Sequence, residues 1–344
     1  MALNDSPTKH LVTLGMFIID TFEFRNDDGE LSGKTIAEQI GGGGTYCAIG
    51  ARVWLPPDRV GMIVDRGHDF PIATQEALDK YGSEIWHFRD DSDRVTTKAV
   101  NIYRGDYRGF QYLTPRIRIT PVDLEGTPLA RPTQLHFICS PKRAAVILQE
   151  VREISEWTPI TIYEPIPFRC VPEELPALRA ILSEIVILSP NAEEAHSLLS
   201  LPGPPTKSSV EHAAQMFLDM GVGKNGSGSV IIRSGAMGAY VLSRDRPSGM
   251  WIDAYWREAE TENVRDVTGA GNSFLGGLSA GLHFAKGDVY EASLYASVSA
   301  SYTVEQNGLP RVDRGSTNRE IWNGDRPEDR LKILRDRHAL RHPA

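Results

Sequence analysis

The chain has 344 residues, 41% of them hydrophobic and 24% charged, which suits one large α/β domain with an elaboration, or two domains. Its net charge of −8 and isoelectric point near 5.6 argue against nucleic acid as an electrostatic partner. The lack of a membrane-length apolar run, a signal-peptide core and a disulfide-like cysteine set predicts a soluble cytoplasmic protein that enters no membrane.

The N-terminal segment predicts a buried strand that ends in an acid. Residues 11–20 are almost continuously apolar and finish at Asp20. Open α/β sheets place ligand groups at the carboxyl ends of their strands, so Asp20 is a candidate binding residue. Taken alone, it could equally be a solvated strand-end carboxylate. Residues 21–39 are polar and turn-rich, and a hairpin turn is expected at 26–29.

Four consecutive glycines, residues 41–44, lead into a helical pattern that continues to residue 51. Glycine lets the chain pass close beneath a bound small molecule, although such runs are common and this one alone is weak evidence. A strand at 60–64 and a helix at 72–80 follow. The alternation over 95–119 predicts exposed strands rather than a buried parallel sheet. The same stretch carries basic residues that suit a solvated strand face or an anionic acceptor: Arg104, Arg108, Arg116 and Arg118.

From about residue 133, strands and helices alternate. The expected strands lie at 134–139, 159–164, 184–189 and 229–233. The expected helices lie at 143–154, 175–182, 192–199 and 210–220. This alternation implies a mainly parallel sheet with helices on both faces. The glycine-rich stretch 221–229 predicts a surface loop, and the charged tail, 313–344, includes an expected amphipathic helix at 327–338.

Two short motifs follow predicted strands in this second half. Asn191 and Glu194 begin a helix, where Asn caps the N-terminus and Glu favours the helix dipole. The Glu194 carboxylate also suits a hard cation such as magnesium. Arg233, Gly235 and Gly238 form a loop that could be a hairpin turn. Arg233 could pair with a phosphate or simply fill space.

The segment 265–274, RDVTGAGNSF, opens directly into a helix of small residues. Consecutive backbone N–H groups at Gly269, Ala270 and Gly271 form a positive cradle for a phosphate. Glycine is needed there because a Cβ would keep the anion away from the backbone. Asp266 stands at the entry to this turn, which favours a structural role over a catalytic one.

These segments resemble the ribokinase (phosphofructokinase-B) family of small-molecule kinases. Its motifs, in order, are G-G-x-x-x-N-x-A, N-x-x-E, T-x-G-x-x-G and D-T-x-G-A-G-D, and the matching residues here are 41–48, 191–194, 233–238 and 266–272. The particular motif sequences look like the fungal "maintenance of killer" branch. The resemblance implies a three-layer α/β/α fold with a mostly parallel sheet. It also implies one domain over 1–312, with a small β-sheet lid from about 21–39 and 93–119.

The resemblance further implies Mg²⁺- and ATP-dependent phosphoryl transfer to a hydroxyl of a sugar, nucleoside or related metabolite. Residues expected to bind this acceptor are Asp20, Gly42, Gly43 and Tyr46. Residues expected at the transferring phosphate are Gly269, Ala270, Gly271 and Asn272. Residues expected to bind the nucleotide are Asn191, Arg233, Gly235, Gly238 and Asp266. Glu194 is expected to help organise the magnesium and its waters. The family often dimerises through its lids, and residues 95–119 suit such a contact, but the sequence does not fix the oligomeric state.

Three residues depart from the family pattern. Asn272 replaces the Asp that takes the acceptor proton, Tyr46 replaces an Asn, and Arg233 replaces a Thr. General-base help is worth about 10²–10⁴-fold, so these departures predict a slow kinase that Asn272→Asp would accelerate. They equally fit a non-catalytic ligand-binding or scaffold protein, and less well a pocket recruited for other chemistry. The histidines show no metal-ligand spacing and are expected at the surface or in satisfied positions: His87, His136, His196 and His212.

Overall fold

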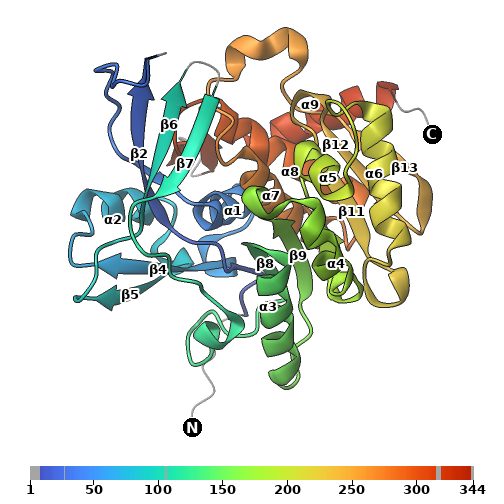
Figure 1. The fold of residues 1–344 in the computed structure, drawn as a ribbon, viewed down its shortest axis with the longest axis horizontal. Coiled ribbons are helices and arrows are strands. Elements are labelled where there is room, and N and C mark those ends of the chain that lie inside the picture. Colours follow the sequence, from blue (N-terminus) through green and yellow to red (C-terminus); the bar gives the residue numbers. More distant parts are fainter. Residues whose placement is uncertain (1–7, 27, 105–106, 315–318, 342–344) are drawn as a thin grey trace.

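The computed structural model describes residues 8–26, 28–104, 107–314 and 319–341, and a nine-stranded sheet forms its centre (Figure 1). The strand order is β13-β12-β11-β10-β9-β8-β1-β4-β5; the strands from β11 to β5 run parallel, and the β11–β12 and β12–β13 pairs are antiparallel. Their bounds are β1 Leu11–Thr13, β4 Val60–Gly67, β5 Trp86–Asp91, β8 Gln134–Cys139, β9 Ile160–Pro165, β10 Ile187–Leu188, β11 Ser229–Arg233, β12 Ala239–Ser243 and β13 Arg246–Ile252.

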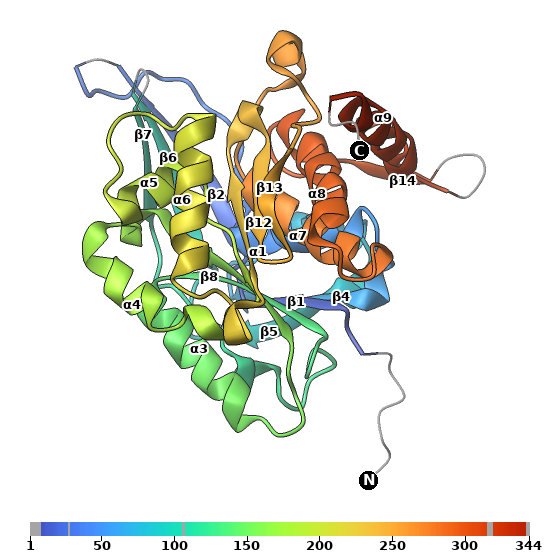
Figure 2. The same ribbon diagram turned by 90° about the vertical axis from the view of Figure 1, so that its right-hand side faces the viewer.

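Helices cover both faces of this sheet, as the strand–helix alternation predicts (Figure 2). One face packs against α3 (Pro141–Glu153), α4 (Leu175–Arg179), α5 (Ala192–Leu199) and α6 (Lys207–Asp219). The other packs against α1 (Gly43–Arg52), α2 (Ile72–Asp79), α7 (Ala270–Phe284), α8 (Val289–Val304) and α9 (Pro327–Arg341). Successive residues of a strand point to opposite faces of the sheet, so Leu11 lies in the apolar cluster on one face and Val12 in the cluster on the other. The three-layer fold is confirmed.

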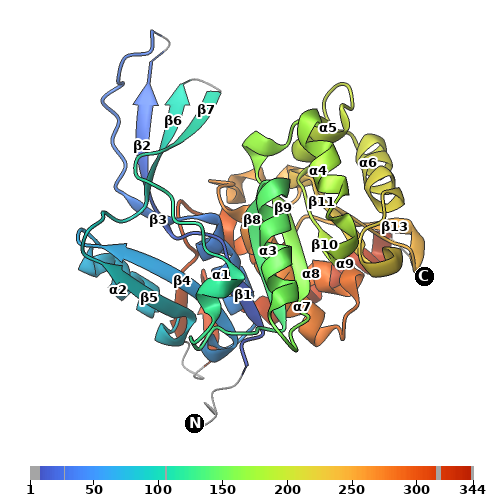
Figure 3. The same cartoon turned by 60° about the horizontal axis from the view of Figure 1, so that its bottom comes forward.

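A smaller mixed sheet of order β3-β2-β6-β7 projects from the main body as a lid (Figure 3). Its strands are β2 (Ile18–Arg25), β3 (Gln39–Gly41), β6 (Lys98–Arg104) and β7 (Tyr107–Tyr112). The β2–β6 pair is parallel, and the other two pairs are antiparallel. Residues 113–119, expected to continue as strand, contain none. Of the turn expected at 26–29, Asp27 lies outside the described residues.

The predicted single strand at 11–20 is wrong in one respect, because the chain breaks into two strands. The first, β1, ends at Thr13 in the main sheet, and β2 begins at Ile18 in the lid. The break lies at Gly15, where a Cβ would stand 2.5 Å from the backbone nitrogen of Gly44. This backbone contact diverts the chain out of the main sheet. Asp20 is therefore the third residue of a lid strand and not the end of a core strand.

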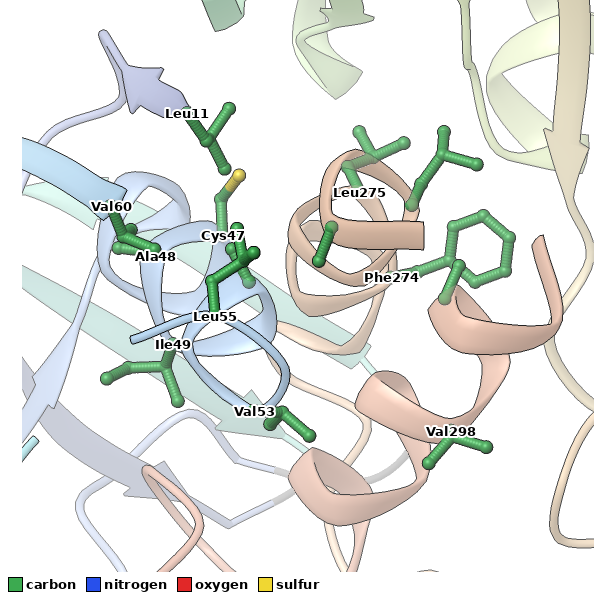
Figure 4. Close-up of a cluster of buried hydrophobic side chains, with 14 of the residues drawn as sticks. Leu11, Cys47, Ala48, Ile49, Val53, Leu55, Val60, Phe274, Leu275 and Val298 are labelled. Atoms are coloured by element: carbon green, nitrogen blue, oxygen red, sulfur yellow. The ribbon is translucent and has the colours of Figure 1, made fainter. Parts of the chain in front are cut away.

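Helices α1 and α7 pack backbone to backbone in the apolar cluster that Figure 4 shows around Cys47 and Leu275. A Cβ at Gly276 would lie 1.9 Å from the carbonyl oxygen of Cys47. In the reverse direction, a Cβ at Gly50 would lie 2.1 Å from the carbonyl oxygen of Ser273. Real Cβ atoms do not approach so closely, so both positions require glycine. These contacts fix where α7 begins relative to α1.

The C-terminal part of the chain packs on α8. Strands β14 (Val312–Arg314) and β15 (Glu320–Trp322) form a separate antiparallel pair. In α9, Arg330 is buried and forms ion pairs with Glu305 and, at 2.7 Å, with Asp325. No helix within the described ranges is both long and apolar enough to cross a membrane.

Candidate active site

Two helix N-termini meet at Asn272. Helix α1 has Gly42 as its N-cap, and α7 has Gly269 as its N-cap. A Cβ at Gly43 would lie 3.2 Å from the Asn272 side-chain nitrogen and 2.7 Å from a methyl carbon of Ile138. Gly42 itself has φ +93° and leaves no room for a Cβ beside the carbonyl oxygen of Met16. The glycine run therefore lets α1 begin directly against the first turn of α7.

Asp20 lies beside this junction, on the lid side. It is buried, and it pairs across the sheet with Gln39 of β3 and Ala99 of β6. A Cβ at Gly41 would lie only 1.9 Å from Asp20 Oδ2. Gly41 thus creates the space in which the carboxylate sits, a function of the glycine run that the sequence did not reveal.

Tyr46 packs beneath the predicted phosphate cradle. Its buried ring lies against Gly269, where a Cβ would stand 2.2 Å from the ring carbon Cγ. Gly269 also has φ +77°, a conformation that glycine adopts without strain. The aromatic ring supports the turn that aims the amides of Ala270 and Gly271.

The Asn272 amide is held by a buried carboxylate. Its Nδ2 donates to Glu164 Oε2 at 2.7 Å, from the first turn of α7 to the end of β9. This orientation leaves the amide oxygen, a hydrogen-bond acceptor with no useful basicity, as the atom free to meet a ligand hydroxyl. An Asp at position 272 would instead place a second carboxylate beside Glu164.

Glu164 and His136 belong to this site, and the sequence analysis assigned neither to it. His136 Nε2 lies 3.5 Å from Glu164 Oε2, and its Nδ1 is hydrogen-bonded to Thr13 Oγ1 at 2.9 Å. His136 is fully buried, so it is not a surface residue but part of the charged centre. The signal that could have found Glu164 is the one that found Asp20, an acid at the end of an apolar strand.

Arg233 connects Glu164, near the end of β9, with Glu194, in the first turn of α5. Its Nη1 lies 2.7 Å from Glu164 Oε1, and its Nη2 lies 3.6 Å from Glu194 Oε2. The same Nη2 donates to the carbonyl oxygen of Ser189 at 3.0 Å. A Cβ at Gly271 would lie 2.1 Å from Arg233 Nη1, so the guanidinium rests against the predicted cradle. The guanidinium therefore lies beside the first-turn amides of α7 while it is paired with Glu164.

The two glutamates beside Arg233 have side-chain pKa values shifted in opposite directions. Burial raises the pKa of Glu164, but Arg233, His136 and the Asn272 amide outweigh it and hold the pKa below its ordinary value. Burial raises the pKa of Glu194 to about 7; Arg233, farther away, opposes this rise, and Glu164 adds to it. Glu164 is therefore ionised at neutral pH, whereas Glu194 titrates near it.

The other predicted nucleotide residues form a neighbouring group. Asn191 Oδ1 accepts from the Glu194 backbone nitrogen, and Glu194 Oε2 accepts from the Asn191 nitrogen, both at 2.7 Å, which is a capping box. A β-bridge joins Asn191 to Arg233. The turn containing Gly235 and Gly238 connects β11 to β12 and is thus a hairpin turn. Asp266 Oδ1 accepts from the Thr268 nitrogen at 2.9 Å and the Thr268 hydroxyl at 2.6 Å.

A cavity of about 720 Å³ lies between the lid and the main sheet. The predicted residues that line it are Asp20, Gly42, Gly43, Tyr46, Gly269 and Asn272. The nucleotide motif residues do not line it; Arg233 and Gly271 lie in contact on the other side of Asn272. The cavity and the contact between Arg233 and Gly271 thus lie on opposite sides of the first turn of α7.

The surroundings of Glu194 fit an indirect contact with magnesium. Mg²⁺ keeps several waters and takes one or two carboxylates plus substrate phosphates, so it requires no closed protein cage. In the part of the chain that the structure covers, no cluster of three or more His, Cys, Asp or Glu is arranged to hold a metal ion. The donor set fits a magnesium held mainly by phosphates and water, with Glu194 beside it.

Known proteins resemble the chain in sequence. Residues 158–311 match the family model described as pfkB family carbohydrate kinase. An uncharacterised protein of Schizosaccharomyces pombe is 33% identical over 346 residues, which cover 95% of this chain and 94% of that protein. Protein MAK32 of Saccharomyces cerevisiae is 33% identical over 365 residues, covering 98% and 96%.

Solved structures share the fold. A ribokinase from Giardia lamblia superposes with a TM-score of 0.72 at 19% identity, covering 96% of this chain and 99% of its own. A putative ribokinase II from Escherichia coli, solved in complex with ATP and Mg²⁺, has a TM-score of 0.65 at 19% identity and covers 96% and 100%. At such identities the likeness extends to the fold alone.

Proposed function

Because the chain belongs to the pfkB family of carbohydrate kinases, we propose that it transfers the γ-phosphoryl group of ATP to a hydroxyl of a sugar, nucleoside or related metabolite. The observation that carries this proposal is the first turn of α7. There, Gly269 and Asn272 line the acceptor cavity, and Gly271 contacts the Arg233 guanidinium. One turn of helix thus separates an acceptor chamber from an anion cradle.

Each group in this arrangement has a defined role in the proposed reaction. Asp20 holds acceptor hydroxyls, and the amide oxygen of Asn272 orients the attacking hydroxyl. The acceptor hydroxyl oxygen attacks the γ-phosphorus, the bond between the γ-phosphorus and the oxygen that bridges to the β-phosphate breaks, and ADP leaves. The hydroxyl proton passes to water or to a phosphoryl oxygen, since no basic group is offered by Asn272. Amides of Ala270 and Gly271 stabilise charge that develops on the phosphoryl group.

Magnesium, when bound, would neutralise charge on the phosphates, with Glu194 beside its waters. Arg233 places a guanidinium group beside the same phosphates, and Glu164, its ion-pair partner, keeps both Arg233 and the Asn272 amide oriented. Positioning and electrostatics account for most catalysis of phosphoryl transfer, so turnover without a base is slow rather than absent.

Calorimetric titration with ATP tests this proposal first. We expect micromolar, magnesium-sensitive binding, because the α7 amides and Arg233 remain in place to bind phosphates. A metabolite screen for phosphorylation follows, with Asn272→Ala as the matched variant that keeps the cradle but loses the amide. Failure to bind ATP up to millimolar concentration would show that the kinase proposal is wrong.

A non-catalytic ligand-binding or scaffold protein is the second candidate. The observation that favours it is the bond between Asn272 and Glu164, which stabilises an amide where the family uses a base. It predicts ligand-dependent stability without turnover. If Asn272→Ala abolishes a chemical conversion, this candidate is excluded.

The lid also suits a homodimer contact. Its outer strands β3 and β7 are edge strands, and nearby apolar side chains are exposed, with Leu31 at 65% and Leu113 at 53%. We expect light scattering to give twice the 38.1 kDa chain mass at micromolar concentration, and Leu31→Asp/Leu113→Asp to give the monomer. A wild-type monomer at all concentrations would contradict this expectation.

A further inference from the structure

One wall of the acceptor cavity is strongly basic. Three separate segments contribute to it: residues 116–118 after β7, the first turn of α3, and the short helix at 167–169. We call this surface the basic wall; it consists of Arg116, Arg118, Lys142, Arg143 and Arg169. Against these cations, Asp20 is the sole acidic residue that lines the cavity among the residues described. The cavity is therefore positively charged although the chain as a whole has a net charge of −8.

Most of the basic wall has no acidic partner. Arg169 forms an ion pair with Glu174. By contrast, Arg143 donates to the backbone carbonyls of Arg118 and Ile119, at 3.1 and 3.5 Å. Among the described residues, four members of the basic wall form no ion pair with a carboxylate: Arg116, Arg118, Lys142 and Arg143. Arg116, Arg118 and Lys142 are exposed and Arg143 is half-buried, and all four line one cavity from two separate segments.

The geometry brings these cations close together. Arg143 Nη2 touches the backbone of Arg118, and both guanidinium groups act on Cys139, whose pKa burial raises to about 12 while the two arginines oppose the rise. Lys142 lies in the first turn of α3, a helix of 13 residues whose N-terminal dipole adds positive potential. These groups together concentrate positive potential on one side of the cavity.

The basic wall is within reach of Asn272. Ile138 approaches Gly43, which contacts Asn272, and Lys142 follows Ile138 by four residues. Asn272 and the basic wall line the same cavity of about 720 Å³, so a single small molecule can place a hydroxyl at Asn272 and an anionic group at the basic wall.

Building on the kinase function proposed above, we propose that the acceptor carries its own anionic group, a phosphate monoester or a carboxylate, which binds Arg118, Lys142 and Arg143. The acceptor class is then a sugar phosphate or sugar acid, rather than a neutral sugar or nucleoside. Bidentate hydrogen bonds from arginine and the point charge of lysine suit both groups.

Matched pairs of probes test this inference by calorimetry in the absence of ATP. The pairs are ribose and ribose 5-phosphate, fructose and fructose 6-phosphate, and glucose and gluconate. We expect at least one anionic probe to bind more than tenfold tighter than its neutral counterpart. The phosphate and carboxylate arms show which group is preferred.

The variant Arg118→Ala/Lys142→Ala removes two side chains that form no hydrogen bond with any other described residue, so its fold should persist. It should weaken binding of the anionic probe about 10- to 100-fold and leave ATP affinity unchanged. The control Lys224→Ala/Lys332→Ala removes the same charge from exposed positions outside the cavity and should change neither.

Equal binding of neutral and anionic probes, no binding of any probe, or unaltered anionic binding by the double variant would each overturn the inference. So would a parallel loss of ATP affinity, which would assign the basic wall to the nucleotide. Failure of the kinase proposal has a different result: ATP does not bind, whatever the sugar probes do.

Discussion

The single substitution Asn272→Asp is expected to leave phosphoryl transfer no faster than in the natural chain. The exchange Asn272→Asp/Glu164→Asn is expected to raise it by about 10²–10⁴-fold, the usual worth of general-base help. This revises the expectation from sequence alone, in which restoring the Asp would be sufficient. The reason is Glu164, whose Oε2 lies 2.7 Å from the nitrogen that an aspartate oxygen would replace.

Two carboxylates at that distance cannot both be ionised, so one has a strongly raised pKa. In Asn272→Asp the pair would share a proton at neutral pH, and the new acid could not accept one efficiently. The exchange moves the carboxylate from position 164 to position 272 and restores the amide–carboxylate hydrogen bond in reverse. Arg233 then faces the same net charge as before.

ATP hydrolysis without acceptor, followed by the metabolite screen, measures the effect in four proteins: natural chain, both single variants and the exchange. Glu164→Asn is the control, because it removes the repelling carboxylate without supplying a base. An equal gain in Asn272→Asp and in the exchange would show that Glu164 does not govern position 272.

Removal of Arg233 is expected to cause the largest loss of stability. Arg233→Ala leaves Glu164 and Glu194, 6% and 5% exposed, facing each other without a counterion. Breaking a buried ion pair by removing one partner costs about 3–5 kcal/mol. Urea unfolding gives this value directly. The matched control is Arg335→Ala, which breaks an exposed pair with Glu291 and should cost about 0–1 kcal/mol.

The loss in Arg233→Ala should also depend on pH. The pKa of Glu194 is raised to about 7 by burial, so its contribution to stability is fully present below its ordinary pKa and is lost as pH rises through 7. Without Arg233 the ionised form is still less favourable, so the variant should lose more stability at pH 8 than at pH 6. A loss that is equal at both values would mean that Glu194 does not titrate in this range.

Local motifs with a backbone requirement were predictable from the sequence. The glycines at 41–44, 269 and 271 permit close approach of two helix starts, and strand–helix alternation after residue 133 dictates the parallel sheet. The order of the family motifs along the chain then predicted that Asp20 and Asn272 lie near one binding chamber. Both residues line the cavity between the lid and the main sheet.

Long-range electrostatics was not predictable in this way. Glu164 lies 108 positions from Asn272 along the chain, and no pattern in the sequence around either residue predicts their hydrogen bond. His136 has an ordinary strand neighbourhood, and only the sheet order β9-β8-β1 brings it between Glu164 and Thr13. The break at Gly15 depends on a contact with Gly44 that hydrophobicity does not reveal.

The glycine contacts between α1 and α7 have a mechanical consequence. Because Gly50 and Gly276 pack directly against the carbonyl oxygens of the opposing helix, α1 and α7 behave as one rigid block. That block carries both the floor of the acceptor chamber and the phosphate cradle, so the distance across which the phosphoryl group would travel is preset. Any change in the width of the chamber would then have to come from the lid, which joins the main body through the segments β1–β2, β3–α1, β5–β6 and β7–β8.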